Sequence, residues 1–166
     1  MAWQRVRVLE RPDLADAILV EHLRRGWGLD AVEIRFMPVG YDAQAWSYDV
    51  RVASGGRFFL KVRRGGMNLA AVRVARYLRG QGLSQVVAAI ESADGDSWDR
   101  LDGFQLLLSP FIAGRQAWDM GLTDEQWGEY GAFLGALHAT DLPPDLASLV
   151  TEETFTCPEA DAVRSL

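Results

Sequence analysis

The sequence predicts an α+β protein built on a five-stranded antiparallel sheet, with one helix inserted after the third strand. Two observations predict this architecture. Two short segments between residues 32 and 52 alternate apolar and polar side chains, and an apolar segment at residues 58–62 follows a short turn, which is typical of an antiparallel meander. A helical pattern then follows a Gly-Gly pair, and two further apolar segments come after it. The order is therefore helix, three strands, helix, two strands and helix.

Residues 1–30 are predicted to form an N-terminal helical extension. Pro12 and Asp13 stand where a helix begins, and Gly26 and Gly28 stand where it ends. The apolar residues between them recur at a spacing near that of an α-helix: Leu14, Ile18, Leu19 and Leu23.

The three strands of the predicted meander occupy residues 32–39, 46–52 and 58–62. In the second strand, Trp, Tyr and Val alternate with Ser, Asp and Arg, a period of two that indicates a half-buried strand. The segment Ser54-Gly55-Gly56 predicts a hairpin turn between the second and third strands.

Residues 68–79 predict the inserted helix, and two short apolar strands are predicted at residues 86–90 and 104–108. The acidic connection between these strands is predicted to be solvated. It resembles a calcium loop only superficially, because Trp98 stands at the fifth position and Asp99 at the sixth. The sequence therefore predicts no calcium site here.

A last helix is predicted from Thr123 to His138. Thr123 and Gln126 have the spacing of a capping box, in which each side chain bonds the backbone of the other residue. Pro143 and Pro144 follow the helix. The remaining residues are acidic and are predicted to pack weakly.

Composition excludes several classes of protein. A net charge of −6 argues against a general affinity for nucleic acid or an anionic membrane. Cys157 is the only cysteine, so no disulfide forms within the chain and no cysteine cluster binds a metal. No signal-type apolar run and no segment of about 18 apolar residues is present, so we expect a cytoplasmic protein without a membrane span.

Lys61 interrupts the apolar third strand, and two explanations remain open. An unpaired ammonium in an apolar setting is costly, so the side chain needs a negative partner or water. The lysine either reaches a phosphate of a ligand or lies at an edge with its charged end in solvent.

Four segments carry more specific information: Pro38–Tyr48, Phe59–Val62, Leu107–Gly114 and Leu134–His138. With a lysine on the third strand and a linker after the fifth, the chain resembles the N-terminal lobe of the protein-kinase-like phosphotransferases. Within that group it most resembles the aminoglycoside phosphotransferase family, including the spectinomycin-type branch. The resemblance covers roughly residues 10 to 142 and only the front half of the family's domain.

The resemblance implies a division of the chain. Residues 31–112 would form a kinase-like N-lobe that binds the nucleotide. Residues 113–166 would form the exit from the hinge and the truncated start of a helical C-lobe. A full-length relative would transfer the γ-phosphoryl group of ATP to a hydroxyl group of an antibiotic or small metabolite.

The resemblance also implies roles for individual residues. Lys61 would hold the α- and β-phosphates of ATP or GTP. The connection from Gly40 to Ser47 would cover the phosphates with backbone N–H groups and the Ser47 hydroxyl, although it is not the glycine-rich loop of protein kinases. The Pro110 carbonyl and the Ile112 N–H would bond the edge of adenine.

Val39, Leu60 and Leu108 are candidates for the apolar walls around the base. The alternative for each of them is an ordinary place in the hydrophobic core.

Two departures from the family pattern limit these expectations. Kinase-like enzymes pair the lysine with a glutamate of the following helix, yet residues 66–82 contain no Asp or Glu, and Glu91 is the nearest substitute. The family's catalytic loop supplies an Asp and then an Asn. The only asparagine here is Asn68, and His138-Ala139-Thr140-Asp141 lacks the spacing of that loop. The sequence therefore offers no catalytic residue and no metal ligand, and Mg²⁺ is expected only if the missing lobe is supplied.

Three hypotheses follow. The first is the ATP-binding part of an antibiotic phosphotransferase, inactive alone. The second is a nucleotide-binding module without catalysis that pairs with a separate C-terminal half. The third is an interaction domain that self-associates through an exposed apolar side, with Phe111, Trp118, Trp127 and Phe133 as candidate residues.

Overall fold

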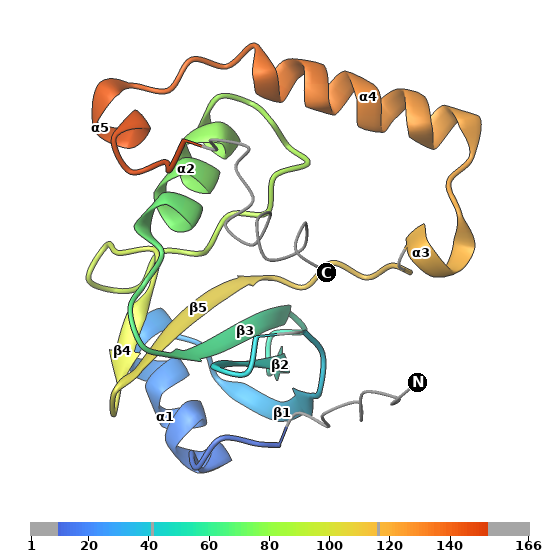
Figure 1. The fold of residues 1–166 in the computed structure, drawn as a ribbon. Coiled ribbons are helices and arrows are strands. Elements are labelled where there is room, and N and C mark those ends of the chain that lie inside the picture. The colour runs from blue at the N-terminus through green and yellow to red at the C-terminus, as the bar shows by residue number, and fades with distance from the viewer. Residues whose placement is uncertain (1–9, 41, 116, 153–166) are drawn as a thin grey trace, which may run out of the picture.

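The computed structural model describes residues 10–40, 42–115 and 117–152 (Figure 1). Tyr41 and Cys157 lie outside the described residues, as does the side chain of Trp118. The elements in chain order are α1 (Asp16–Trp27), β1 (Ala31–Met37), β2 (Ala45–Val52), β3 (Arg57–Arg64), α2 (Leu69–Gly80), β4 (Asp99–Leu101), β5 (Phe104–Pro110), α3 (Ala117–Met120), α4 (Asp124–His138) and α5 (Pro144–Ala147).

The strands form one antiparallel sheet in the order β1-β2-β3-β5-β4. The first three strands are a meander of neighbours in sequence, as the alternating pattern predicted. Helix α2 is inserted after β3, and the chain then returns to place β5 beside β3 (Figure 1). The predicted α+β architecture is confirmed.

The predicted position of the fourth strand is wrong. Residues 86–90 are not a strand, and β4 lies instead in the acidic connection at Asp99–Leu101. Asp102 and Gly103 both have positive φ angles, of 47° and 80°, and join β4 to β5. An Asp-Gly pair with this backbone is a tight hairpin turn whose twist matches its strands. The hairpin therefore occupies the edge of β5 that residues 86–90 were expected to fill.

Residues 86–90 still contact the sheet at one point. The Ile90 N–H donates to the Leu108 carbonyl at 2.7 Å, and the Ile90 carbonyl accepts from Nε1 of Trp27 at 3.1 Å. One hydrogen bond to β5 does not make a ladder. The segment is thus held between α1 and β5 without becoming a strand.

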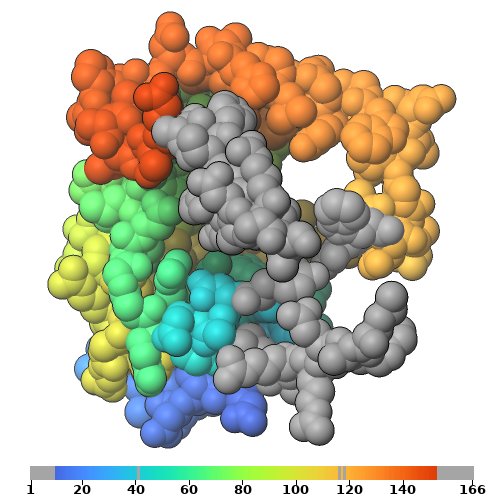
Figure 2. All heavy atoms as spheres, viewed as in Figure 1, coloured from blue at the N-terminus to red at the C-terminus, as the bar shows by residue number. Residues whose placement is uncertain are grey.

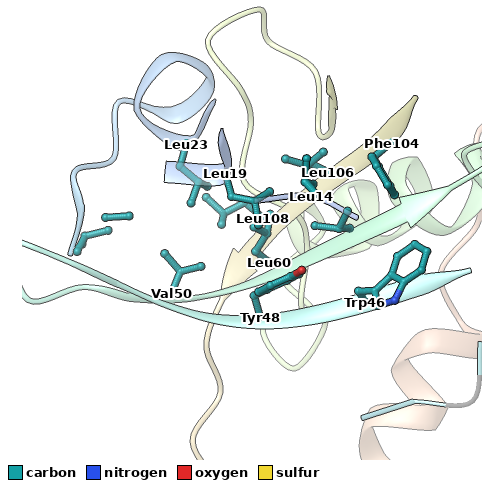
Figure 3. Close-up of a cluster of buried hydrophobic side chains, with 13 residues drawn as sticks. Leu14, Leu19, Leu23, Trp46, Tyr48, Val50, Leu60, Phe104, Leu106 and Leu108 are labelled. Carbon is teal, nitrogen blue, oxygen red and sulfur yellow. The ribbon is translucent and has the colours of Figure 1, made fainter. Parts of the chain in front are cut away.

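One face of the sheet carries the hydrophobic core. Leu19 and Leu23 of α1 are fully buried against the even-numbered residues of the central strands (Figure 3). On β2, β3 and β5 the core residues are Trp46, Tyr48, Val50, Leu60, Val62, Phe104, Leu106 and Leu108. Because strand side chains alternate, the odd-numbered residues of these strands lie on the opposite face.

Helix α2 begins at Leu69, directly after Asn68, where the predicted helix of residues 68–79 begins. The Asn68 side chain accepts a hydrogen bond from the Ala71 N–H at 3.1 Å, which satisfies one of the free donors of the first turn. Val72 and Leu78 are buried, whereas Arg73, Arg76 and Arg79 are exposed. The helix therefore has a buried apolar face and an exposed basic face.

Helix α4 has the predicted capping box between Thr123 and Gln126, and it ends at His138 as expected. None of its residues is buried, although its sequence is largely apolar, and Trp127 is 56% exposed. It lies along the upper edge of the molecule, away from the sheet (Figures 1 and 2). Among the described residues, no helix has both the length and the apolar character needed to cross a membrane.

Candidate functional site

Lys61 lies on the sheet face opposite to α1. In the register of the sheet it stands between Ser47 of β2 and Leu107 of β5. Its neighbours in sequence, Leu60 and Val62, are fully buried in the core on the other face. Alternation along the strand therefore directs Lys61 away from the core, with Ser47 and Leu107 beside it.

Lys61 has no acidic partner in the part of the chain that the structure describes, because none of the ion pairs there involves it. Glu91, the expected substitute for the missing glutamate, pairs with Arg76 of α2 instead. The sequence contains 17 lysines and arginines together, and Lys61 is its only lysine.

Asp49 lies on the same face as Lys61, but its carboxylate is already hydrogen-bonded to two arginines. Arg57 donates from Nε and Nη2 to the two carboxylate oxygens at 2.8 and 2.9 Å, and Arg35 donates at 2.9 Å. The hydrogen bonds from Arg57, more than those from Arg35, lower the pKa of Asp49 to about 2, although its burial opposes this shift. The carboxylate is therefore held by Arg57 and Arg35, and among the described residues it forms no ion pair with Lys61.

The chain leaves β5 at a segment that is anchored to Arg57. The Phe111 N–H donates to the Arg57 carbonyl at 3.1 Å, and the Arg57 guanidinium lies 3.7 Å from the centre of the Phe111 ring. The Leu108 carbonyl accepts from Ile90, so alternation directs the Pro110 carbonyl to that side, away from β3. Ile112 is 66% exposed, and its N–H donates no backbone hydrogen bond to a described residue.

The loop between β1 and β2 lies at the end of the sheet that contains Arg63. Gly40 has a φ of 108°, a conformation that favours glycine, and the structure leaves open space where a side chain would begin. Asp42 organises the loop, because its carboxylate accepts from the Gln44 N–H at 2.9 Å and its carbonyl from the Ala45 N–H at 3.1 Å. Val39 is 48% exposed, so its side chain is available to a ligand.

The structure brings Lys61 and Ser47 together as direct cross-strand neighbours. It places Gly40 and Val39 on the loop before β2, and Pro110 and Ile112 at the opposite end of β3 and beyond. Leu60 and Leu108 do not line this face, because both are fully buried in the core beneath α1. For these two residues the core alternative is the right one.

Phe59 and Leu107 were missed by the sequence analysis. Both are partly buried and both lie on the face of Lys61, Phe59 by alternation along β3 and Leu107 as the direct partner of Lys61. Counting every second residue from Lys61 would have found Phe59. Only the strand register could have found Leu107.

A cavity of about 410 Å³ lies elsewhere, between α2, residues 96–98 and α5. Its lining includes Arg73, Arg76, Tyr77 and Trp98 but not Lys61. Within the described residues, no group of three or more His, Cys, Asp or Glu side chains could hold a metal ion. The cavity and the residues around Lys61 are therefore separate features of the structure.

The sequence of this chain matches a family model over residues 33–164. That model, APH, describes the phosphotransferase enzyme family. The chain belongs to this family. The resemblance to aminoglycoside phosphotransferases that the four sequence segments indicated is thereby confirmed.

Solved structures of phosphotransferases share the fold. Spectinomycin phosphotransferase APH(9)-Ia in complex with ADP and spectinomycin matches with a TM-score of 0.84 at 24% identity, over 93% of this chain and 46% of that chain. Its AMP-bound complex matches with a TM-score of 0.79 at 23% identity, over the same shares. The amicoumacin kinase hAmiN, in complex with AMP-PNP, Ca²⁺ and Ami, matches with a TM-score of 0.57 at 17% identity, over 80% of this chain and 43% of that chain.

These likenesses confirm the kinase-like N-lobe fold that was expected of the sheet and its inserted helix. The chain spans less than half the length of the solved structures that it matches. No protein of curated function matches the sequence.

Proposed function

We propose that this chain is the nucleotide-binding part of a phosphotransferase that moves the γ-phosphoryl group of ATP or GTP to a hydroxyl group of an aminoglycoside-type antibiotic or a related small molecule. The observation that supports this most directly is Lys61, the only lysine, which lies on the sheet face opposite to the core and has no carboxylate partner among the described residues. In kinase-like enzymes, the lysine at this position binds a phosphate group of the nucleotide. Such a protein is expected to work in the cytoplasm, where the nucleotide is supplied.

The residues around Lys61 fit a nucleotide that lies along β3. Lys61 would hold the α- and β-phosphates, with the loop at Gly40 above them. Ser47 is buried beside Lys61, so its hydroxyl orients the lysine more readily than it reaches a phosphate. Phe59 and Leu107 would contact the apolar surface of the nucleotide from the sheet.

The segment after β5 fits the base of the nucleotide. The Pro110 carbonyl points away from β3, and the Ile112 N–H has no described backbone partner, which leaves one acceptor and one donor for the edge of adenine. Val39 would contact the base from the loop. The likeness to complexes with ADP, AMP and AMP-PNP supports a nucleotide on this fold.

We propose further that residues 1–166 do not complete the reaction by themselves. The family's catalytic loop requires an Asp followed by an Asn, and the only asparagine here caps α2. His138 ends α4, and the Asp141 carbonyl accepts from the Tyr77 hydroxyl. Phosphorylation of spectinomycin or another aminocyclitol by the purified chain with Mg-ATP would contradict this part of the proposal.

A second candidate function is that of a binding module that pairs with a separate C-terminal half or with a second copy of itself. The exposed apolar surface of α4 favours it, since Trp127 and Tyr130 are 56% and 48% exposed. Sedimentation across a range of concentrations tests self-association, and a monomer throughout would exclude the second copy.

The experiment for nucleotide binding uses the single lysine. An amine-acylating reagent can modify only Lys61 and the N-terminal amine, so each can be followed by mass spectrometry. ATP is expected to slow the acylation of Lys61 at least fivefold and to leave the N-terminal amine unchanged. Equal rates with and without ATP would contradict the proposal.

Calorimetry provides an independent measurement. Lys61→Ala is expected to lower the affinity for ATP at least tenfold, because a charge-assisted hydrogen bond to phosphate contributes roughly 1.5–3 kcal/mol. Arg64→Gln is the matched control. It removes one positive charge three residues away, on the opposite face of β3, where the Arg64 guanidinium lies 4.9 Å from the centre of the Phe104 ring. Absence of binding by the parent chain would refute the proposed function.

A further inference from the structure

Two buried polar atoms next to Lys61 have no hydrogen-bond partner among the described residues. They are Nε of Arg63 on β3 and Oε1 of Gln105 on β5. The two residues stand directly opposite each other in the strand register. Leaving a buried donor unsatisfied costs roughly 1–3 kcal/mol, so the Nε–H of Arg63 is a donor that an added acceptor would satisfy. Oε1 of Gln105 is itself an acceptor and is not a partner for an anion.

Arg63 lies on the face of Lys61 and farther from the segment that leaves β5. Along β3, Phe58 pairs with Pro110, Lys61 comes three residues later, and Arg63 comes two residues after Lys61. At about 3.3 Å per residue, Lys61 is roughly 10 Å and Arg63 roughly 17 Å from that pair. A nucleotide with its base at Pro110 and its α- and β-phosphates at Lys61 would extend its terminal phosphate towards Arg63.

Arg63 is currently engaged with the loop above this end of the sheet. Its Nη1 lies 3.7 Å from Oδ2 of Asp42, and the two side chains are 36% and 43% exposed. An exposed pair at this distance contributes at most about 1 kcal/mol. A phosphate dianion can therefore displace Asp42 from Arg63.

The charges around Arg63 favour an anion. Helix α2, which follows β3, contains no acidic residue, and Asp49 is already held by Arg35 and Arg57. The unpartnered Nε–H of Arg63 provides the second donor of a bidentate contact to one phosphate group, beside a terminal N–H.

We propose that Arg63 binds the terminal phosphate of a nucleoside triphosphate, and that Asp42 holds Arg63 only while this phosphate is absent. The proposal rests on the proposed nucleotide site at Lys61. It assigns Lys61 to the phosphates that ATP and ADP share, and Arg63 to the one that only ATP carries. Arg63 then determines whether the site prefers a triphosphate to a diphosphate.

The test measures the affinities for ATP and ADP by calorimetry. Arg63→Gln is expected to weaken ATP binding roughly tenfold, the loss of one charge-assisted contact, and to change ADP binding less than twofold. Lys61→Ala is expected to weaken both, and Arg64→Gln to weaken neither. Thermal unfolding of each variant shows whether it is folded.

A second variant is expected to gain affinity for ATP relative to ADP, so its result does not depend on a loss of binding. Asp42→Asn removes the charge that competes for Arg63 and keeps a side-chain oxygen that can accept from the Gln44 N–H, so the ratio of ATP affinity to ADP affinity should rise about twofold to fivefold. An equal loss of ATP and ADP affinity in Arg63→Gln, or no change in either, would overturn the proposed role of Arg63 but would not contradict the nucleotide site at Lys61. A parent chain that binds neither nucleotide would overturn both proposals.

Discussion

The guanidinium of Arg57 lies 3.7 Å from the centre of the Phe111 ring. The same guanidinium donates two hydrogen bonds to Asp49, and the Arg57 carbonyl accepts from the Phe111 N–H. One side chain thus connects β2, the start of β3 and the segment that leaves β5. Because that segment carries Pro110 and Ile112, this contact positions the groups proposed to hold the base.

Arg57→Lys tests this arrangement. Lysine keeps the charge but loses the two-pronged donor geometry and the planar stacking on Phe111. We expect the free energy of unfolding in urea to fall by about 1–3 kcal/mol. Arg51→Lys is the control, because Arg51 forms an exposed ion pair in which its Nε lies 3.5 Å from Oε2 of the exposed Glu33. Its effect on the free energy of unfolding should stay below about 0.5 kcal/mol. Equal losses in both variants would show that the stacking is unimportant.

The low pKa of Asp49 predicts a loss of stability in acid. Its carboxylate titrates near pH 2 in the folded chain and near the ordinary value of 3.8 when unfolded. The stabilisation is therefore complete above about pH 4 and is lost as the pH falls towards 2, an effect on the order of 2 kcal/mol. Urea unfolding between pH 2 and 7 measures it. In Asp49→Asn this part of the pH dependence should be absent, and an unchanged profile would contradict the assignment.

Helix α1 passes close to β4 at Gly26. A side-chain carbon at this position would come within 2.7 Å of Oδ2 of Asp99, an oxygen that also lies 2.9 Å from Nε2 of His22. Gly26→Ala should therefore lower the free energy of unfolding by about 1–3 kcal/mol, as overpacking does. Gly128→Ala in α4 is the matched control, because open space surrounds that position. It should stabilise the helix by up to about 1 kcal/mol.

Helix α4 should be the least protected of the long helices. An isolated helix of 15 residues is marginally stable in water, and α4 has no buried residue to stabilise it. We expect the amides of Asp124–His138 to exchange with deuterium at least a hundredfold faster than those of β2 and β3. Slow exchange that becomes fast on dilution would instead show that a second copy covers the helix.

Much of the fold could be predicted because its signals are local. The meander followed from the period-two pattern of residues 46–52, and the start of α4 followed from Thr123 and Gln126. The fourth strand was misplaced because apolar character at residues 86–90 was given more weight than the Asp102-Gly103 turn. That turn sets the hairpin through its backbone angles, and such a signal is also local.

The candidate site was less predictable, because its residues depend on register and pairing. The family resemblance implied Leu60 and Leu108 as candidates for the wall of the site, with the hydrophobic core as the alternative, and both lie in the core. The side chains beside Lys61 are instead Ser47 and Leu107, which belong to other strands. Glu91 could not be excluded as a partner of Lys61 until the structure paired it with Arg76.

The sequence by itself determined the α+β class, the three-stranded meander with the helix inserted after it, and the single lysine on the third strand, because these follow from residue types and short-range periodicity. Only the tertiary structure decided which face of β3 lies against the core, which acids are already paired, and that Nε of Arg63 and Oε1 of Gln105 stand on neighbouring strands without hydrogen-bond partners among the described residues. The physical reason is that a strand residue acts through neighbours on adjacent strands. Those neighbours are set by hydrogen-bond register and not by distance along the chain.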